Sequence, residues 1–260
     1  MDLQIRGKSA LVTGASSGLG LAIAKALAAE GVRVAISSRS RSRIEEAAAL
    51  VGNGTVPLVC DMSDTLARAE LADQASAHLG PLDILIVNSG GPPSGPFEAQ
   101  DDQRFAAVLH EHLGGVVALA RSAIPAMRER GWGRILTVTS CMAKQPSAGM
   151  ILSNVARAAV TAFSKTCANE VAMHGITVNN LMPGYTMTDR IAELSGQIAE
   201  REGTNVETVR SAWEAQIPAG RLGKPEEFAA VAAFLCSEHA AYVTGTSISV
   251  DGGWNKGLFG

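Results

Sequence analysis

The sequence predicts an α/β fold in which seven parallel strands form one doubly wound sheet with helices on both faces. Two observations support this. Short runs rich in β-branched residues alternate along the chain with longer stretches rich in Ala and Leu, a pattern typical of parallel strands joined by crossover helices. The chain also has 260 residues, 47% of them hydrophobic, which suits one large core and therefore a single domain.

The elements follow from this alternation. Strands are expected at residues 9–14, 32–37, 55–60, 82–88, 134–140, 176–182 and 246–250. Helices are expected at residues 18–30, 42–50, 65–79, 103–130, 154–174 and 226–237. Ligands of such sheets bind at the carboxyl ends of the strands. The segment at residues 185–223 is the only long irregular insertion, and we expect it to form a lid over that site.

Composition narrows the class of protein. The net charge is −3 and the basic residues are scattered, so neither nucleic acid nor an anionic membrane is an expected partner. The first residues lack the pattern of a secretion signal, and no apolar run reaches the roughly 18–20 residues that span a membrane. We expect a soluble, cytoplasmic protein with a small-molecule substrate.

The four cysteines indicate neither disulfides nor a metal site. Cys60, Cys141, Cys167 and Cys236 are far apart in the sequence, and none forms a Cys-x-x-Cys pair or lies near a histidine at ligand spacing. Cys141 follows Ser140 directly. It is expected either to face a pocket or, as the simpler alternative, to be a small buried thiol.

A glycine-rich motif follows the first strand. In TGASSGLG, Gly14, Gly18 and Gly20 stand where a strand gives way to a helix, and glycines at this point let the backbone approach a pyrophosphate at the helix N-terminus. Alone, the motif also fits an ordinary strand-to-helix turn.

Further motifs occur in a fixed order after it: Asp61, NSGG at 88–91, Ser140, Pro183-Gly184 and VDGG at 250–253. Together they resemble the short-chain dehydrogenase/reductase family over the whole chain. RLGKPEE at 221–227 and TGTSISVDGG at 244–253 resemble the subgroup that contains ketoacyl-carrier-protein reductases. Ser89 and Gly91 depart from the usual Asn-Ala-Gly, which we interpret as an altered loop shape.

The resemblance implies a Rossmann-like, NADP-binding domain over residues 1–260. Gly14, Ser16, Gly18 and Leu19 would line the phosphates, Asp61 and Met62 would meet the adenine, Asn88 and Gly90 would lie along the ribose, and Thr188 would hold the carboxamide. Ser17, Gly20, Pro183, Gly184 and Thr186 complete the set of cofactor-binding residues.

The end of the second strand indicates which cofactor is bound. An acidic residue there would bind the 2′-OH of NAD, but Ser38 occupies the position and Arg39 follows it. A guanidinium favours the 2′-phosphate of NADP, so NADP(H) is the expected cofactor. Arg41 and Arg43, close by, also fit a solvated basic helix start.

The reaction centre departs most from the family pattern. The resemblance implies four catalytic positions, normally Asn, Ser, Tyr and Lys, and here they hold His112, Ser140, Ser153 and Arg157. A serine hydroxyl is too weak an acid to replace a phenol, and Arg, unlike Lys, does not act as a proton carrier.

Several groups could compensate for the missing phenol. His112 is expected either to donate a proton or to be hydrogen-bonded to backbone behind the site, while His110 would face elsewhere. Tyr185 is either a relocated phenol or a pocket-wall aromatic. Reduction of a conjugated enone would need less proton donation, because Ser140 and Arg157 could stabilise the enolate. Divergent members that resemble this chain, including bacilysin-pathway reductases, reduce conjugated double bonds.

Three functions therefore compete. The first is an NADP(H)-dependent reductase of a small carbonyl or conjugated enone with an atypical active site. The second is a catalytically silent nucleotide-binding or sensor protein. The third is a non-redox enzyme on the same fold, similar to halohydrin dehalogenases. Small-residue faces on helices 111–130 and 154–174, with the C-terminal segment 250–260, predict a homo-oligomer, most simply a tetramer.

Overall fold

The computed structural model describes residues 1–258, and the seven predicted strands form one parallel sheet with the order β3-β2-β1-β4-β5-β6-β7. The strands are β1 (Ser9–Thr13), β2 (Arg33–Ser38), β3 (Val56–Val59), β4 (Ile84–Val87), β5 (Gly133–Val138), β6 (Ile176–Pro183) and β7 (Ser247–Val250). All residues of β1 and β4 are buried, as expected for central strands covered on both faces. The predicted fold class is confirmed.

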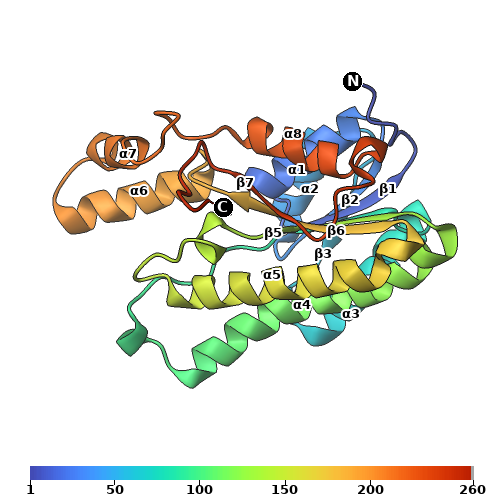
Figure 1. Cartoon of the computed structure of the whole chain (residues 1–260), viewed down its shortest axis with the longest axis horizontal. Coiled ribbons are helices and arrows are strands. Elements are labelled where there is room, and N and C mark those ends of the chain that lie inside the picture. The colour runs from blue at the N-terminus through green and yellow to red at the C-terminus, as the bar shows by residue number, and fades with distance from the viewer. Residues whose placement is uncertain (259–260) are drawn as a thin grey trace.

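Helices cover both faces of the sheet (Figure 1). One face carries α1 (Gly18–Ala29), α2 (Arg41–Val51) and α8 (Pro225–Leu235), whose apolar side chains share one core with β1, β2 and β4. The other face carries α3 (Thr65–Leu79), α4 (Asp102–Arg130) and α5 (Ile151–Val171), which enclose a second core. Two apolar layers therefore hold the central strands rigidly in place.

The chain reverses its winding direction between β1 and β4. From β1 the sheet grows outward through β2 and β3, and from β4 it grows the other way through β5, β6 and β7. This arrangement leaves a crevice beyond the carboxyl ends of β1 and β4, which is where open α/β sheets bind ligands. The segments that follow these two strands therefore start the site.

The expectation of an irregular structure at residues 185–223 is wrong for most of that segment. It contains α6 (Asp189–Glu202) and α7 (Val206–Glu214), which extend away from the sheet beyond β6 (Figure 1). Thr188 and Asn205 cap the two helices with their side chains, and Gly203 ends α6 in a left-handed conformation. These capping signals are present in the sequence. Apolar residues also recur at helical spacing, with Ile191, Leu194 and Ile198 in α6 and Val209 and Trp213 in α7.

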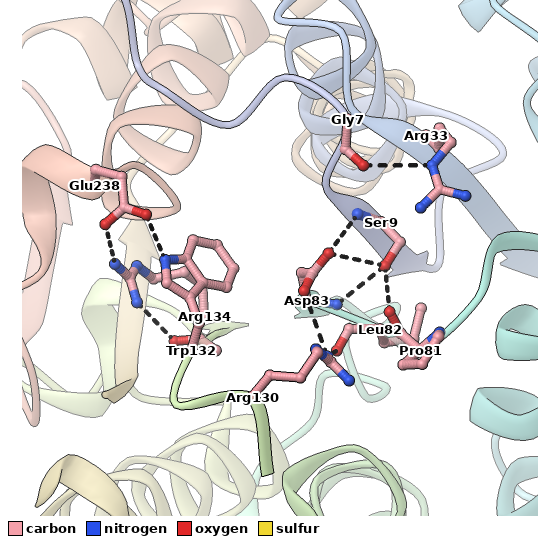
Figure 2. A network of polar contacts seen from close by, with 11 residues as sticks. Gly7, Ser9, Arg33, Pro81, Leu82, Asp83, Arg130, Trp132, Arg134 and Glu238 are labelled. Carbon is pink, nitrogen blue, oxygen red and sulfur yellow. Dashed lines mark hydrogen bonds and ion pairs between the residues drawn. The ribbon is translucent and has the colours of Figure 1, made fainter. Parts of the chain in front are cut away.

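A polar network closes the opposite end of the sheet (Figure 2). The Asp83 carboxylate accepts hydrogen bonds from the backbone N–H and the hydroxyl of Ser9, and it lies 3.4 Å from the Arg130 guanidinium. Close by, the Glu238 carboxylate accepts a 2.7 Å hydrogen bond from the Trp132 indole and pairs with the buried Arg134 at 3.6 Å. These contacts satisfy polar groups at the amino ends of the strands.

Within residues 1–258, no helix combines the length and the apolar character needed to cross a membrane.

Candidate functional site

The glycine-rich loop is tied to the end of β4. The Asn88 side-chain amide donates a 2.9 Å hydrogen bond to the Gly14 carbonyl, while the Thr13 hydroxyl donates to the Asn88 carbonyl at 2.7 Å. A Cβ atom at Gly14 would lie 2.6 Å from that carbonyl oxygen, and Gly14 has a φ of +57°. Both facts explain why only glycine fits here.

The loop leads directly into the N-terminus of α1. A Cβ atom at Gly20 would lie 2.4 Å from the Gly14 carbonyl oxygen, so glycine also lets helix and strand approach closely. Ser17 is the N-cap residue, and its side chain makes no capping hydrogen bond. The first amides of α1 therefore remain available at the crevice, where they favour a negative charge. This cradle fits a dinucleotide pyrophosphate.

A cleft runs past this cradle in two connected parts. The first is a cavity of about 640 Å³ beside β2, and the second is a cavity of about 310 Å³ beside β5 and α5. They share Gly14, Ser17, Asp189, Arg190 and the stretch 88–91. Among the expected cofactor-binding residues, Gly14, Ser16, Ser17, Gly18, Leu19, Ser38, Arg39, Met62, Asn88, Gly90, Pro183, Gly184, Thr186 and Thr188 line one or both parts.

Two of the expected cofactor-binding residues lie outside the lining of the cleft. Gly20 packs behind the loop, against the Gly14 carbonyl. The Asp61 carboxylate accepts hydrogen bonds from the backbone N–H and hydroxyl of Ser63 at 2.9 and 2.8 Å, and these bonds are the main cause that lowers the pKa of Asp61. Asp61 thus stabilises the turn after β3, and Met62 provides the buried wall.

The larger cavity has basic side chains at its β2 end. Ser38, Arg39 and Arg43 all line it. Arg41, by contrast, pairs with Glu45 at 3.5 Å on the exposed side of α2. Arg43 therefore joins Arg39 at the cavity, although its position in the sequence fits a solvated helix start equally well.

The smaller cavity holds three of the four expected catalytic positions. Ser140, Ser153 and Arg157 line it together. The Ser140 hydroxyl accepts a 3.2 Å hydrogen bond from the backbone N–H of Met142, which fixes the hydroxyl at the end of β5. Ser153 is buried on the face of α5 that meets the cavity.

Arg157 is a buried cation in this cavity. Its Nη1 donates a 2.7 Å hydrogen bond to the Val138 carbonyl, and no partner for its buried Nε is found within residues 1–258. Burial, followed by the charge of Arg190, lowers the pKa of Arg157 to about 10, while Glu111 opposes the change. The side chain therefore remains cationic at neutral pH.

His112 lies on the α4 side of the cleft, where it lines the larger cavity. Its Nδ1 lies 2.9 Å from the Ser89 hydroxyl, so its partner is a side chain and not backbone. Burial, followed by the charges of Arg157 and Arg190, lowers the pKa of His112 to about 4. The imidazole is consequently neutral near pH 7. His110 points elsewhere and contacts Thr65 and Arg68.

Tyr185 and Cys141 both reach the smaller cavity. The Tyr185 ring stacks on Trp213 with a centroid distance of 5.0 Å and meets Trp254 edge-on at 6.0 Å, and burial raises the pKa of its phenol. This geometry favours a wall aromatic. Burial raises the pKa of Cys141 to about 12, so its thiol stays protonated and unreactive.

Sequence reasoning missed two polar residues of the cleft. Arg190 donates a 3.2 Å hydrogen bond to the Gly91 carbonyl and lines both cavities, and Ser89 contacts His112. A usable signal existed for Arg190, because it follows the Thr188 cap in the first turn of the helix after PGYTMT. For Ser89, only its departure from the family pattern gave a hint.

Comparisons with known proteins agree with this geometry. A family model described as "Enoyl-(Acyl carrier protein) reductase" matches residues 14–255. The 3-oxoacyl-[acyl-carrier-protein] reductase FabG of Escherichia coli (strain K12) is 34% identical over 251 residues, which cover 96% of this chain and 98% of that protein.

Solved structures that are similar to this chain are also reductases. L-sorbose reductase from Gluconobacter frateurii, complexed with NADPH and L-sorbose, has a TM-score of 0.95 at 33% identity and covers 99% of this chain and 100% of that chain. YwfH, an NADPH-dependent reductase involved in bacilysin biosynthesis, has a TM-score of 0.91 at 32% identity, with 96% and 99% covered. The chain therefore belongs to the short-chain dehydrogenase/reductase family of oxidoreductases, in the subgroup that includes the FabG reductases.

Proposed function

We propose that this protein is an NADP(H)-dependent reductase that acts on a small carbonyl or conjugated enone substrate with an atypical active site. The observation that carries the proposal is the continuity of the cleft. The glycine cradle at α1 opens on one side to a basic cavity and on the other to a cavity lined by Ser140, Ser153 and Arg157. A dinucleotide can therefore lie across the cradle and reach both.

NADP(H) is the proposed cofactor because of the side chains at the β2 end. Ser38 supplies a neutral hydroxyl there, and Arg39 and Arg43 supply guanidinium groups that match a phosphate dianion. The L-sorbose reductase and YwfH structures, each described with NADPH, lend support by similarity.

The proposed chemistry follows from the side chains in the smaller cavity. Bound NADPH would supply a hydride to an electrophilic carbon of the substrate. Negative charge then develops on the substrate oxygen, and Ser140 and Arg157 are the groups that stabilise it by a hydrogen bond and a fixed positive charge. Arg157 keeps this charge across the neutral pH range because its pKa remains near 10.

Proton delivery is the atypical part. We interpret Ser153 and Arg157 as replacements for the family's Tyr and Lys, so no phenol stands at the usual donor position. His112 is neutral, and the Tyr185 ring is packed against Trp213 and Trp254, which leaves water as the proton source. An enone suits such a site better than a saturated ketone, because the enolate is a weaker base than an alkoxide.

We propose that residues 185–223 act as the lid of this site and that residues 1–260 form one NADP-binding domain, of which 259–260 lie outside the described part. Tyr185 and Thr186 begin this segment and line the cavity, while Trp213 and Leu222 anchor its two helices in a small apolar cluster. Closure of such a segment would exclude water from the reacting carbon.

The test is NADPH oxidation with paired substrates, a saturated ketone and the matching enone, together with calorimetric titration of NADPH. Binding of NADPH with turnover of the enone supports the proposal. Tight binding without turnover on any pair would identify a silent nucleotide-binding protein, and absence of NADPH and NADH binding would favour a non-redox enzyme.

A further inference from the structure

Two guanidinium groups converge on the substrate end of the cleft. Arg157 comes from α5 and Arg190 from the first turn of α6, and both line the 310 Å³ cavity together with Ser140. The charge of Arg190 lowers the pKa of Arg157, and, after burial, the charges of Arg157 and Arg190 lower the pKa of His112. The two side chains therefore create a positive field in a small, partly enclosed space.

Neither guanidinium forms an ion pair among the described residues. No carboxylate there lies within 4.0 Å of Arg157 or Arg190, although five other ion pairs are present. The carboxylates nearest to them are Glu111, whose charge raises the pKa of Arg157, Asp189, which lines both cavities, and Glu193, which lines the larger cavity.

The buried member of the pair has unused hydrogen-bonding capacity. Arg157 is only 8% exposed, its Nη1 is bonded to the Val138 carbonyl, and its Nε lacks a partner within residues 1–258. An uncompensated buried charge is unfavourable. A ligand anion bound between Arg157 and Arg190 would compensate the buried positive charge.

The position of the pair argues for a substrate anion and against the cofactor pyrophosphate. The free amides at the start of α1 already provide a place for the pyrophosphate. Arg157 lines only the substrate cavity, not the larger one, and Arg190 stands at the junction of the two. The same cavity has apolar walls that include Tyr185 and Trp254.

We propose that the substrate is a small organic acid, and that Arg190, supported by the charge of Arg157, binds its carboxylate while the reducible carbonyl or enone lies at Ser140. A planar carboxylate matches the fork of a guanidinium, and the aromatic wall suits a flat or cyclic body. This inference rests on the proposed reductase function, and it excludes substrates whose only polar group is a neutral carbonyl.

The binding experiment uses the NADPH-loaded protein and two probes of the same shape, benzoate and benzamide. Calorimetry should show benzoate binding and much weaker benzamide binding. Arg190→Gln should weaken benzoate binding by about tenfold or more, as expected for loss of one charge-assisted hydrogen bond. It should weaken NADPH binding much less, although Arg190 also lines the larger cavity. Arg201→Gln, on the exposed part of the same helix, is the matched control and should bind benzoate like the parent.

The turnover experiment compares β-benzoylacrylate with its ethyl ester. The acid should have the lower KM, and Arg190→Gln should remove that preference mainly through KM. Three results would each overturn the inference. The first is equal binding of benzoate and benzamide, and the second is a preference for the ester. The third is an Arg190→Gln variant that loses as much affinity for NADPH as for benzoate. Turnover of the ester alone would overturn the inference of an acidic substrate but leave the proposed reductase function intact. Failure of NADPH binding would refute the reductase function itself.

Discussion

The hydroxyl of Ser89, after β4, lies 2.9 Å from Nδ1 of His112 on α4. We interpret both residues as departures from the family pattern, with Ser89 in place of the usual Ala and His112 in place of the usual Asn. The hydroxyl gives the buried imidazole a hydrogen-bond partner in a place where Arg157 and Arg190 disfavour its protonation. We infer that the two departures form one unit, which holds a neutral histidine beside the cleft.

This relationship predicts a pH dependence of stability. The pKa of His112 is about 4 in the folded protein and 6.5 without the fold. His112 therefore does not oppose folding above pH 6.5, where the imidazole is neutral in both states. Stability is lost as the pH falls from 6.5 toward 4, because the unfolded state then binds a proton that the folded state does not. The full size of this loss is about 3 kcal/mol.

Urea unfolding of the parent and of His112→Asn at several pH values measures this effect. The difference in the free energy of unfolding between parent and variant should change between pH 6.5 and 4, because the variant lacks the titrating imidazole. His110→Asn removes the exposed histidine of the same helix and should behave like the parent. A pH profile of the difference that stays flat would show that His112 does not carry the effect.

Cofactor choice is predicted to depend on Arg39. Arg39→Ala should weaken the binding of NADPH by about 1.5–3 kcal/mol, the contribution of a charge-assisted hydrogen bond to the phosphate. The binding of NADH should remain nearly unchanged. Arg41→Ala is the matched control, since Arg41 pairs with Glu45 and does not line the cavity. Titration of both cofactors measures this, and equal affinity of the parent for NADPH and NADH would contradict the assignment.

The network at the opposite end of the sheet is predicted to support stability alone. Glu238→Gln removes the carboxylate that faces the buried Arg134 (Figure 2), and we expect a loss of about 1–2 kcal/mol in the free energy of unfolding. NADPH affinity should not change, because the cleft lies at the other ends of the strands. Glu202→Gln breaks only an exposed pair on α6 and should have almost no effect on stability. Reduced NADPH affinity in Glu238→Gln would show that the two ends are coupled.

A homo-oligomer, most simply a tetramer, is also expected. Val155, on the same helix as the small-residue face used for this prediction, is 40% exposed, and an exposed apolar side chain on a helix of small residues is suited to contact with a second copy. Light scattering over a range of concentrations measures the mass. A constant value near 26.9 kDa would show a monomer.

The sequence predicts the fold well because its strongest signals are local. The β-branched runs give the strands, and the glycine loop gives the first crossover, since each depends on neighbouring residues alone. The helices of residues 189–214 also have local signals, since Ile191, Leu194 and Ile198 recur at helical spacing after the Thr188 cap, so the expectation of an irregular segment overlooked them. The contacts that define the cleft escape prediction for another reason. Ser89 meets His112 and Arg190 meets Gly91 across long stretches of chain, and only the folded sheet brings them together.

Ser153 and Arg157 are expected to form a working site in place of the usual Tyr and Lys. In that case, Ser153→Tyr combined with Arg157→Lys should not simply raise the native activity. The new phenol should favour reduction of saturated ketones, because a phenol can protonate an alkoxide. The bulk of tyrosine would fill part of the 310 Å³ cavity, and loss of the guanidinium would remove a permanent positive charge beside the developing oxyanion. Turnover of the best enone should therefore fall while turnover of the best ketone rises, as measured for the parent, both single variants and the double variant. If the double variant instead improved on both substrates alike, Ser153 and Arg157 would represent a loss of function and not a different active site.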